Sequence, residues 1–180
     1  MKNFSNTYIF TFSLIMVVVV AVLLSFVAMQ LKPRQQMNQE IERKSDILHS
    51  VGEAREADDV KDYNAFIEQE FEKYITDSYV VNFEGEEVQD ADAFAVTLGL
   101  KEQADRKATE RLYPVFVYTG ESGNQKYIVP VRGKGLWGPI WGYVAFETDM
   151  NTIFGVIYDH AKETPGLGAD INAEWFERKF

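Results

Sequence analysis

Residues 127–170 read YIVPVRGKGLWGPIWGYVAFETDMNTIFGVIYDHAKETPGLGAD, and they decide how the rest of the chain can fold. A β-rich run is broken by a turn rich in glycine at 133–139, resumes at Ile140, and ends in a second glycine turn at 166–168. Glycine lets the backbone approach a ligand closely and leaves N–H groups uncovered. The two turns therefore suit a planar anionic ligand. They also suit two ordinary tight turns between strands.

The first turn carries a cation and aromatic faces. Lys134 can offer a positive charge to a phosphate, and Trp137 and Trp141 are large apolar rings. Tryptophan is used more often in cores than in binding sites, because it buries a large area. We expect Trp141 to belong to the core and Trp137 to lie near the ligand.

The second turn reads ETPGLG from Glu163 to Gly168. Pro165 favours an extended backbone at the residue before it. A helix predicted at 169–176 would point its free N–H groups back toward this turn, an arrangement that suits an anion or the polar edge of a ring. Leu167 would supply apolar contact to that ring. The alternative is an ordinary loop before a helix.

Alternating apolar residues predict strands at 112–119, 126–131, 140–147 and 152–158, separated by short turns, and an earlier strand at 79–83. Helical spacing predicts helices at 35–48, at 62–75, and at 92–107 with an interruption near Gly99. Residues 52–61 are charged and predict a loop. Consecutive strands joined by short turns, with helices before and after them, indicate an antiparallel sheet in an α+β domain.

The stretch from Tyr8 to Met29 is long and apolar enough to cross a membrane as a helix. A cleavable signal peptide is the alternative, but Lys32-Pro33-Arg34 follows instead of a cleavage site of small residues. We expect a retained transmembrane anchor at 1–34 and a soluble domain at 35–180. The basic residues that follow the span favour a cytoplasmic position for that domain.

Composition excludes several kinds of function. The net charge of −10 argues against a nucleic-acid surface. The chain has no cysteine, so it has no disulfide, no thiol nucleophile and no cysteine-ligated iron–sulfur cluster, and its two histidines do not indicate a metal site. No arrangement of serine, histidine and acid suggests nucleophilic catalysis. We expect no catalytic side chain and no metal ligand.

The phrases GKGLWGPIWGY (133–143) and HAKETPGLGAD (160–170) resemble the FMN-binding domain of the C subunits of the Na+-translocating NADH:quinone reductases. The resemblance implies an FMN-dependent electron-transfer subunit that passes electrons towards quinone within a multisubunit complex of the bacterial inner membrane. It places the soluble domain in the periplasm, against the charge count. It also implies the cofactor-binding residues Lys134, Gly135, Leu136, Trp137, Glu163, Thr164, Gly166, Leu167 and Gly168.

The sequence departs from this family at the flavin attachment site. The family esterifies FMN to a threonine of an S-G-A-T motif, and the 180 residues contain no such motif. The one Ser-Gly pair, Ser122-Gly123, precedes Asn124 in a predicted hairpin turn. We therefore expect a truncated or split C-terminus and no covalent flavin on this chain. Two alternatives remain: the related G subunit of the ion-pumping ferredoxin:NAD complexes, and a membrane-anchored sensor or ligand-binding domain without a redox role.

Overall fold

The computed structural model describes residues 5–54 and 60–180, and the chain divides into two compact units at Glu40/Ile41. A single helix, α1 (Asn6–Ser50), contains both the predicted membrane segment and the predicted helix at 35–48, with Pro33 inside it. Among the described residues α1 is the one helix long and apolar enough to span a membrane. Its most apolar window has a mean hydropathy of 2.9, and none of that window is buried. The predicted loop at 52–61 lies partly outside the described residues.

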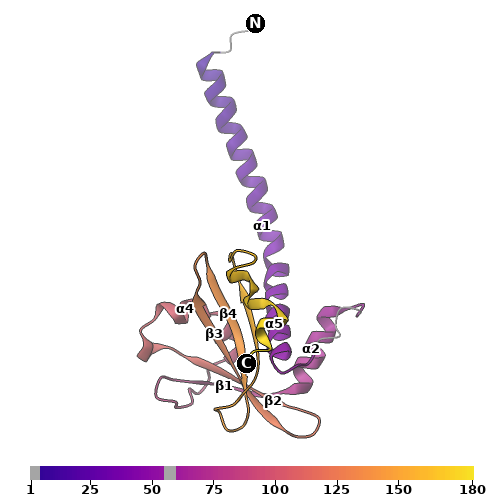
Figure 1. Ribbon diagram of the computed structural model, residues 1–180. Coiled ribbons are helices and arrows are strands. Elements are labelled where there is room, and N and C mark those ends of the chain that lie inside the picture. Colours follow the sequence, from indigo (N-terminus) through magenta and orange to yellow (C-terminus); the bar gives the residue numbers. More distant parts are fainter. Residues whose placement is uncertain (1–4, 55–59) are drawn as a thin grey trace. The chain divides into compact units, whose positions relative to one another are not determined.

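The second unit is built on a five-stranded antiparallel sheet whose strands follow one another in sequence order (Figure 1). The strands are β1 (Ile75–Val81), β2 (Tyr113–Thr119), β3 (Gln125–Lys134), β4 (Pro139–Phe146) and β5 (Ile153–His160). The four consecutive predicted strands are confirmed as β2 to β5. The predicted strand at 79–83 starts earlier, at Ile75, and becomes the first strand of the same sheet.

Helices cover one face of this sheet. Phe116, Ile128 and Ala145 are neighbours across β2, β3 and β4 and are almost fully buried. They share a core with residues of α1, of α2 (Tyr63–Tyr74) and of α3 (Ala93–Leu98). The predicted helix at 92–107 is divided at Gly99 into α3 and α4 (Leu100–Asp105), and the 3-10 turn η2 (Ala108–Glu110) follows. The α+β class is confirmed.

The last part of α1 runs along β4 and β5. The Arg43 guanidinium lies 5.0 Å from the centre of the Trp141 ring, near the start of β4. At the other end, the Ser50 carbonyl approaches Gly155 so closely that an added Cβ would stand 2.5 Å from it. Arg43 therefore marks the end of the sheet where β3 turns into β4 and where β5 finishes. This end carries both glycine turns.

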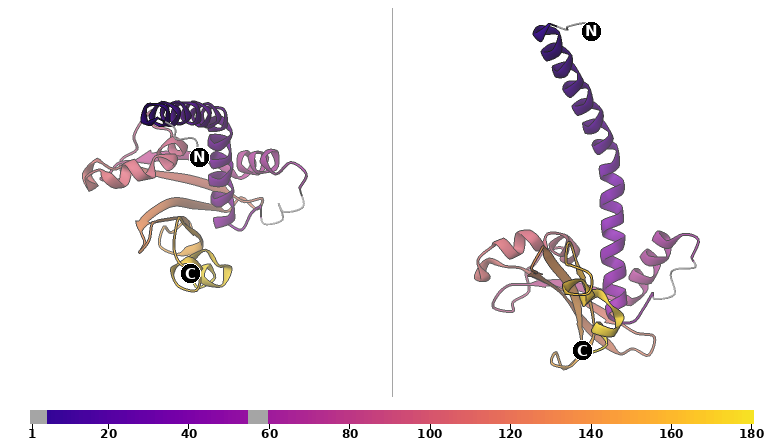
Figure 2. Two further views of the ribbon diagram at one scale, coloured as in Figure 1. Left: turned by 90° about the horizontal axis from the view of Figure 1, so that it is seen from above. Right: turned by 45° about the horizontal axis from the view of Figure 1, so that its top comes forward.

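The C-terminal segment packs on β5 (Figure 2). It consists of a 3-10 turn, η3 (Gly168–Asn172), and one short helical turn, α5 (Glu174–Glu177). The predicted continuous helix at 169–176 is wrong, because Ala173 takes an extended backbone with ψ 134° and separates the two turns. The Tyr158 N–H of β5 donates to the Glu177 carboxylate over 3.0 Å, which satisfies a donor at the edge of the sheet.

Candidate functional site

The first loop, residues 135–138, is shorter than the sequence suggested. Gly133 and Lys134 pair with Ile140 and Pro139, so the ladder between β3 and β4 continues to the end of β3. The Gly135 N–H donates to the Gly138 carbonyl over 2.8 Å and closes the turn. The predicted turn at 133–139 is therefore confined to the four residues 135–138.

The second loop, residues 163–168, is closed by its own backbone. The N–H groups of Leu167 and Ala169 both donate to the Thr164 carbonyl, over 3.1 and 3.2 Å. Gly166 takes a φ of +75°, which glycine adopts without strain, and its N–H donates to the Asp170 carboxylate over 3.2 Å. These N–H groups point to partners within the chain. The structure does not support the expectation that they are free for an anion.

Glu163 joins the two loops. Its side chain is only 9% exposed, and its Oε1 accepts from the N–H groups of Trp137, over 2.9 Å, and Gly138, over 3.2 Å. Hydrogen bonds to a charged acceptor are among the stronger ones in proteins. The anion held by the first loop is thus the chain's own carboxylate. Glu163 is among the predicted cofactor residues, but no local pattern indicates this contact, because its partners lie 25 and 26 residues earlier.

Two glycines leave room for the carboxylate in this position. A Cβ at Gly135 would collide with Glu163 Oε1 and would stand 3.0 Å from the Gly138 carbonyl. A Cβ at Gly168 would stand 2.8 Å from Glu163 Oε2. The sequence predicted that these glycines admit a ligand to the backbone. In the structure both make room for Glu163.

The side chains at the tips of the loops are apolar and exposed. The exposed fraction is 83% for Leu136, 64% for Trp137 and 76% for Leu167. Because Glu163 bonds directly to the Trp137 backbone, these residues lie at the same end of the sheet. Exposed large apolar residues that gather in one place mark binding surfaces. Trp141 is half-buried beneath Arg43 and is not among the buried core residues, so it is only partly the core residue that we expected. The position of Trp137 near a ligand stays a prediction.

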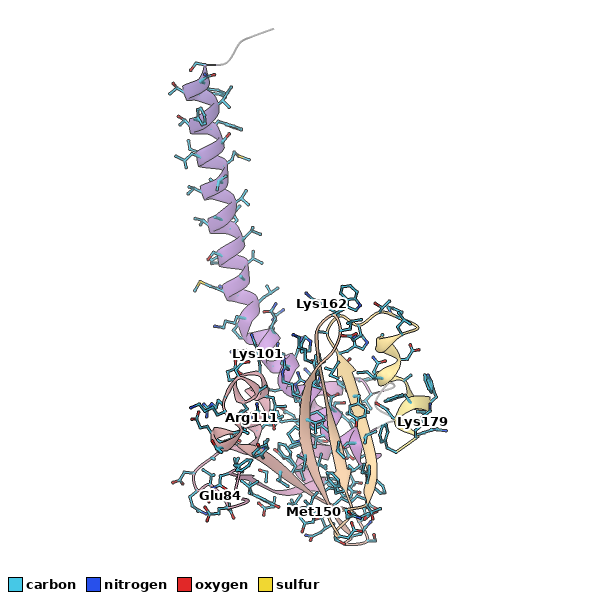
Figure 3. All side chains as sticks on the ribbon, turned by 60° about the vertical axis from the view of Figure 1, so that its left-hand side comes forward. Glu84, Lys101, Arg111, Met150, Lys162 and Lys179 are labelled. Atoms are coloured by element: carbon cyan, nitrogen blue, oxygen red, sulfur yellow. The ribbon has the colours of Figure 1, made fainter. Side chains whose placement is uncertain are left out.

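A groove of about 700 Å³ lies beside the first loop, between it and α4. It is called the basic groove below, because four of its lining side chains are cationic and one is acidic. Figure 3 shows two of the cations, Lys101 and Arg111, on the same side of the sheet. The sequence does not indicate the groove, since its cations are far apart in the chain. The lining residues are Lys101, Ala104, Asp105, Arg111 and residues 132–139.

A polar cluster lies under the same end of the sheet. Burial raises the pKa of the Asp46 carboxyl to about 7, although the Arg43 guanidinium, 3.7 Å away, acts in the opposite direction. Burial also raises the pKa of the Tyr143 hydroxyl. The Trp141 Nε1 is buried without a hydrogen-bond partner among the described residues. Within the described part of the chain, no three histidine or acidic side chains are grouped closely enough to hold a metal ion.

The family model described as an FMN-binding domain matches residues 135–179, which contain both loops. The C subunit of the Na(+)-translocating NADH-quinone reductase of Haemophilus ducreyi is 32% identical over 161 residues, covering 82% of this chain and 60% of the relative. The same subunit of Vibrio parahaemolyticus is 29% identical over 178 residues, covering 89% of this chain and 68% of the relative.

Two solved structures are similar in fold. The crystal structure of the C subunit from Parabacteroides distasonis has a TM-score of 0.66 and 35% identity, covering 83% of this chain and 67% of that one. The structure of Shewanella oneidensis NqrC has a TM-score of 0.57 and 26% identity, covering 78% of this chain and 68% of that one. Among the curated relatives, the alignment spans 60% of the length of the Haemophilus ducreyi subunit and 68% of the Vibrio parahaemolyticus subunit.

Proposed function

This chain belongs to the family of the C subunits of the Na(+)-translocating NADH-quinone reductases, and we propose that it is an FMN-dependent electron-transfer subunit of such a membrane complex. One observation carries the proposal. The FMN-binding match spans residues 135–179, and Glu163 joins the two loops of that segment, whose tips carry exposed apolar side chains at the same end of the sheet. When bound, FMN supplies the redox chemistry, accepting and donating electrons one or two at a time.

The residues at the loops fit a flavin. Leu136, Trp137 and Leu167 offer apolar contact to a planar ring, and Lys134 offers a positive charge to a phosphate. Glu163 would act as a positioning residue, because its carboxylate already bonds the first loop and fills the space between the glycines. The proposed cofactor residues Thr164 and Gly166 would shape the second loop, since the Thr164 carbonyl closes it.

The remaining proposals concern the complex. Residues 1–34 would anchor the chain in the inner membrane, and residues 35–180 would form a soluble domain in the periplasm, as the family resemblance implies. The partners would be the other subunits of a redox complex that delivers electrons towards quinone. The 180 residues contain no S-G-A-T motif, so this chain would hold FMN without a covalent bond. The relatives named above favour this assignment over the G subunit.

An FMN titration of the full chain in lipid nanodiscs tests the proposal. Binding should quench flavin fluorescence, and denaturation should release all of the flavin. Trp137→Ala should weaken binding by about tenfold, because one stacked aromatic contact is lost. Trp175→Ala is the matched control, since Trp175 is also exposed (55%) but lies outside the loops. A wild-type chain without FMN affinity would favour the sensor alternative, and equal losses in the two variants would place the ring elsewhere.

A further inference from the structure

The basic groove is a concave surface built from three separate parts of the chain. α4 contributes Lys101 and Asp105, and the end of β3 contributes Arg132 and Lys134. Arg111 comes from the short connection between η2 and β2. Arg132 lies on the helix-covered face of the sheet, because it shares the face of the buried Ile128 on β3, where every second side chain points the same way. It pairs across the ladder with Trp141. The groove's volume of about 700 Å³ is within the range of small-molecule sites.

In the lining of this groove, which belongs to the described part of the chain, four cations face one acid. Lys101, Arg132 and Lys134 form no ion pair with any carboxylate of the described residues, although the chain carries 28 acidic residues. Asp105 is the one acid in the lining. Gathering like charges costs free energy unless an opposite charge joins them. In a chain of net charge −10, such a cluster indicates an anionic ligand.

Arg111 is already held in place. Its Nε donates to the Arg106 carbonyl and its NH2 group to the Ala104 carbonyl, each over 3.1 Å, so the guanidinium closes the end of α4. Holding the side chain in advance lowers the entropy lost when a ligand binds. A fixed guanidinium beside exposed lysines is an arrangement that suits phosphate oxygens, which accept several hydrogen bonds at once.

We propose that the basic groove binds the phosphate group of a phosphate ester. The organic part of the ester would lie over Leu136 and Trp137, which line the same groove and are largely exposed. Two sources present this chemistry: a soluble ester such as FMN, and the headgroup of an anionic phospholipid around a membrane-anchored chain. The first source rests on the function proposed above, whereas the second does not.

The test compares wild type with Lys101→Gln/Arg132→Gln in the full chain. In zwitterionic nanodiscs, wild type should bind FMN more tightly than riboflavin, and inorganic phosphate should compete with FMN. In nanodiscs that contain phosphatidylglycerol, occupation of the groove by lipid should instead change Trp137 fluorescence without any soluble ligand. In either arm the double variant should weaken binding by at least about tenfold, because two charge-assisted contacts are lost. Lys61→Gln, which removes one positive charge at an exposed position outside the groove, should bind as wild type.

The outcomes separate this proposal from the function proposed above. If FMN and riboflavin bind equally, phosphate does not compete, and phosphatidylglycerol has no effect, the groove is not a phosphate site even though the flavin function stands. If no flavin binds but phosphatidylglycerol changes Trp137 fluorescence in wild type and not in the double variant, the flavin function fails and the groove proposal stands. Equal binding by wild type and the double variant in both arms overturns the groove proposal, and circular dichroism confirms that the variants fold.

Discussion

The two loops and the basic groove lie side by side but differ in whether their charged side chains have partners within the protein. In the loops, the Glu163 carboxylate is buried and accepts hydrogen bonds from two backbone N–H groups, so its partners belong to the protein itself. In the groove, Lys101 and Arg132 have no carboxylate partner among the described residues. The loops therefore form a preorganised apolar platform, and the groove provides charge for a ligand. Contacts that stabilise the fold and cations that are available to an anion come from different side chains at this end of the sheet, although residues 135–138 belong both to the first loop and to the lining of the groove.

The largest expected effect comes from removing the carboxylate. Glu163→Ala leaves the Trp137 and Gly138 N–H groups without their acceptor and opens a space between the loops, so it should lower the free energy of unfolding by about 3 kcal/mol. Glu163→Gln keeps an acceptor oxygen and should cost roughly half as much. Urea unfolding of the full chain in detergent measures both changes.

The matched control is Glu121→Gln, because Glu121 is exposed and pairs with Lys73 at the surface. It should change the free energy of unfolding by less than about 0.5 kcal/mol. If Glu163→Ala costs no more than this control, Glu163 does not hold the loops, and the comparison between loops and groove fails.

The next effect distinguishes two reasons for a glycine. Gly135→Ala places a Cβ against the Glu163 carboxylate and the Gly138 carbonyl, and overpacking of this kind should cost about 2 kcal/mol. Gly166→Ala meets no atom within 4 Å but must keep a φ of +75°, which should cost about 1 kcal/mol. In the background Glu163→Ala, the Gly135 cost should shrink and the Gly166 cost should not. The same urea titrations provide the test, and equal costs in both backgrounds would contradict the role of Glu163 at Gly135.

The sequence predicted the parts of this fold that depend on local patterns. Alternation of apolar residues located β2 to β5, and helical spacing located α2. The first strand was found but not placed in the sheet, because its pairing with β2 joins Val81 to Tyr113 across two helices. The continuous helix at 169–176 failed at Ala173, where no glycine or proline marks the break.

The site was predicted in its members but not in its contacts. The glycines of ETPGLG and GKGLWG correctly indicated two loops, because glycine is typical of tight turns. The tryptophan of GKGLWG marked the first of these loops as the one with an aromatic side chain. The bond from Glu163 to the first loop depends on how the hairpin and the end of β5 meet, which no local pattern contains. The basic groove joins Lys101 to Arg132 in the same way, so it too is visible only in three dimensions.

Asp46 is a further carboxyl group with little exposure, and its effect on stability should depend on pH. No backbone N–H of the described residues donates to the Asp46 carboxyl, whereas two donate to Glu163. Burial raises the pKa of Asp46 in the folded protein to about 7, above its unfolded value near 3.8. The charged form is therefore penalised in the folded state, so Asp46 lowers stability above pH 7, and this cost disappears as the pH falls from about 7 towards 4. The shift corresponds to an upper bound of about 4 kcal/mol, and we expect roughly 2 because the side chain is 22% exposed.

The measurement is the difference between wild type and Asp46→Asn as a function of pH. The variant should be more stable than wild type at pH 8, and the difference should vanish near pH 4. A matched change of an exposed acid, Glu68→Gln, should give a difference that is nearly constant over this range. A pH-independent difference for Asp46→Asn would mean that this carboxyl titrates normally and that burial does not distinguish it from Glu68.

The smallest expected effect tests whether the cations of the basic groove contribute to the stability of the fold. Lys101→Gln/Arg132→Gln removes two cations that form no ion pair with the described residues, so the free energy of unfolding should stay within about 0.5 kcal/mol of wild type. The direction should be stabilising at low salt, because repulsion among the groove cations is relieved, and the gain should fade as salt screens it. Urea titrations at low and high ionic strength measure this. A loss comparable to that of Glu163→Ala would show that these cations support the fold, and the groove would then be a structural element instead of a surface kept free for an anion.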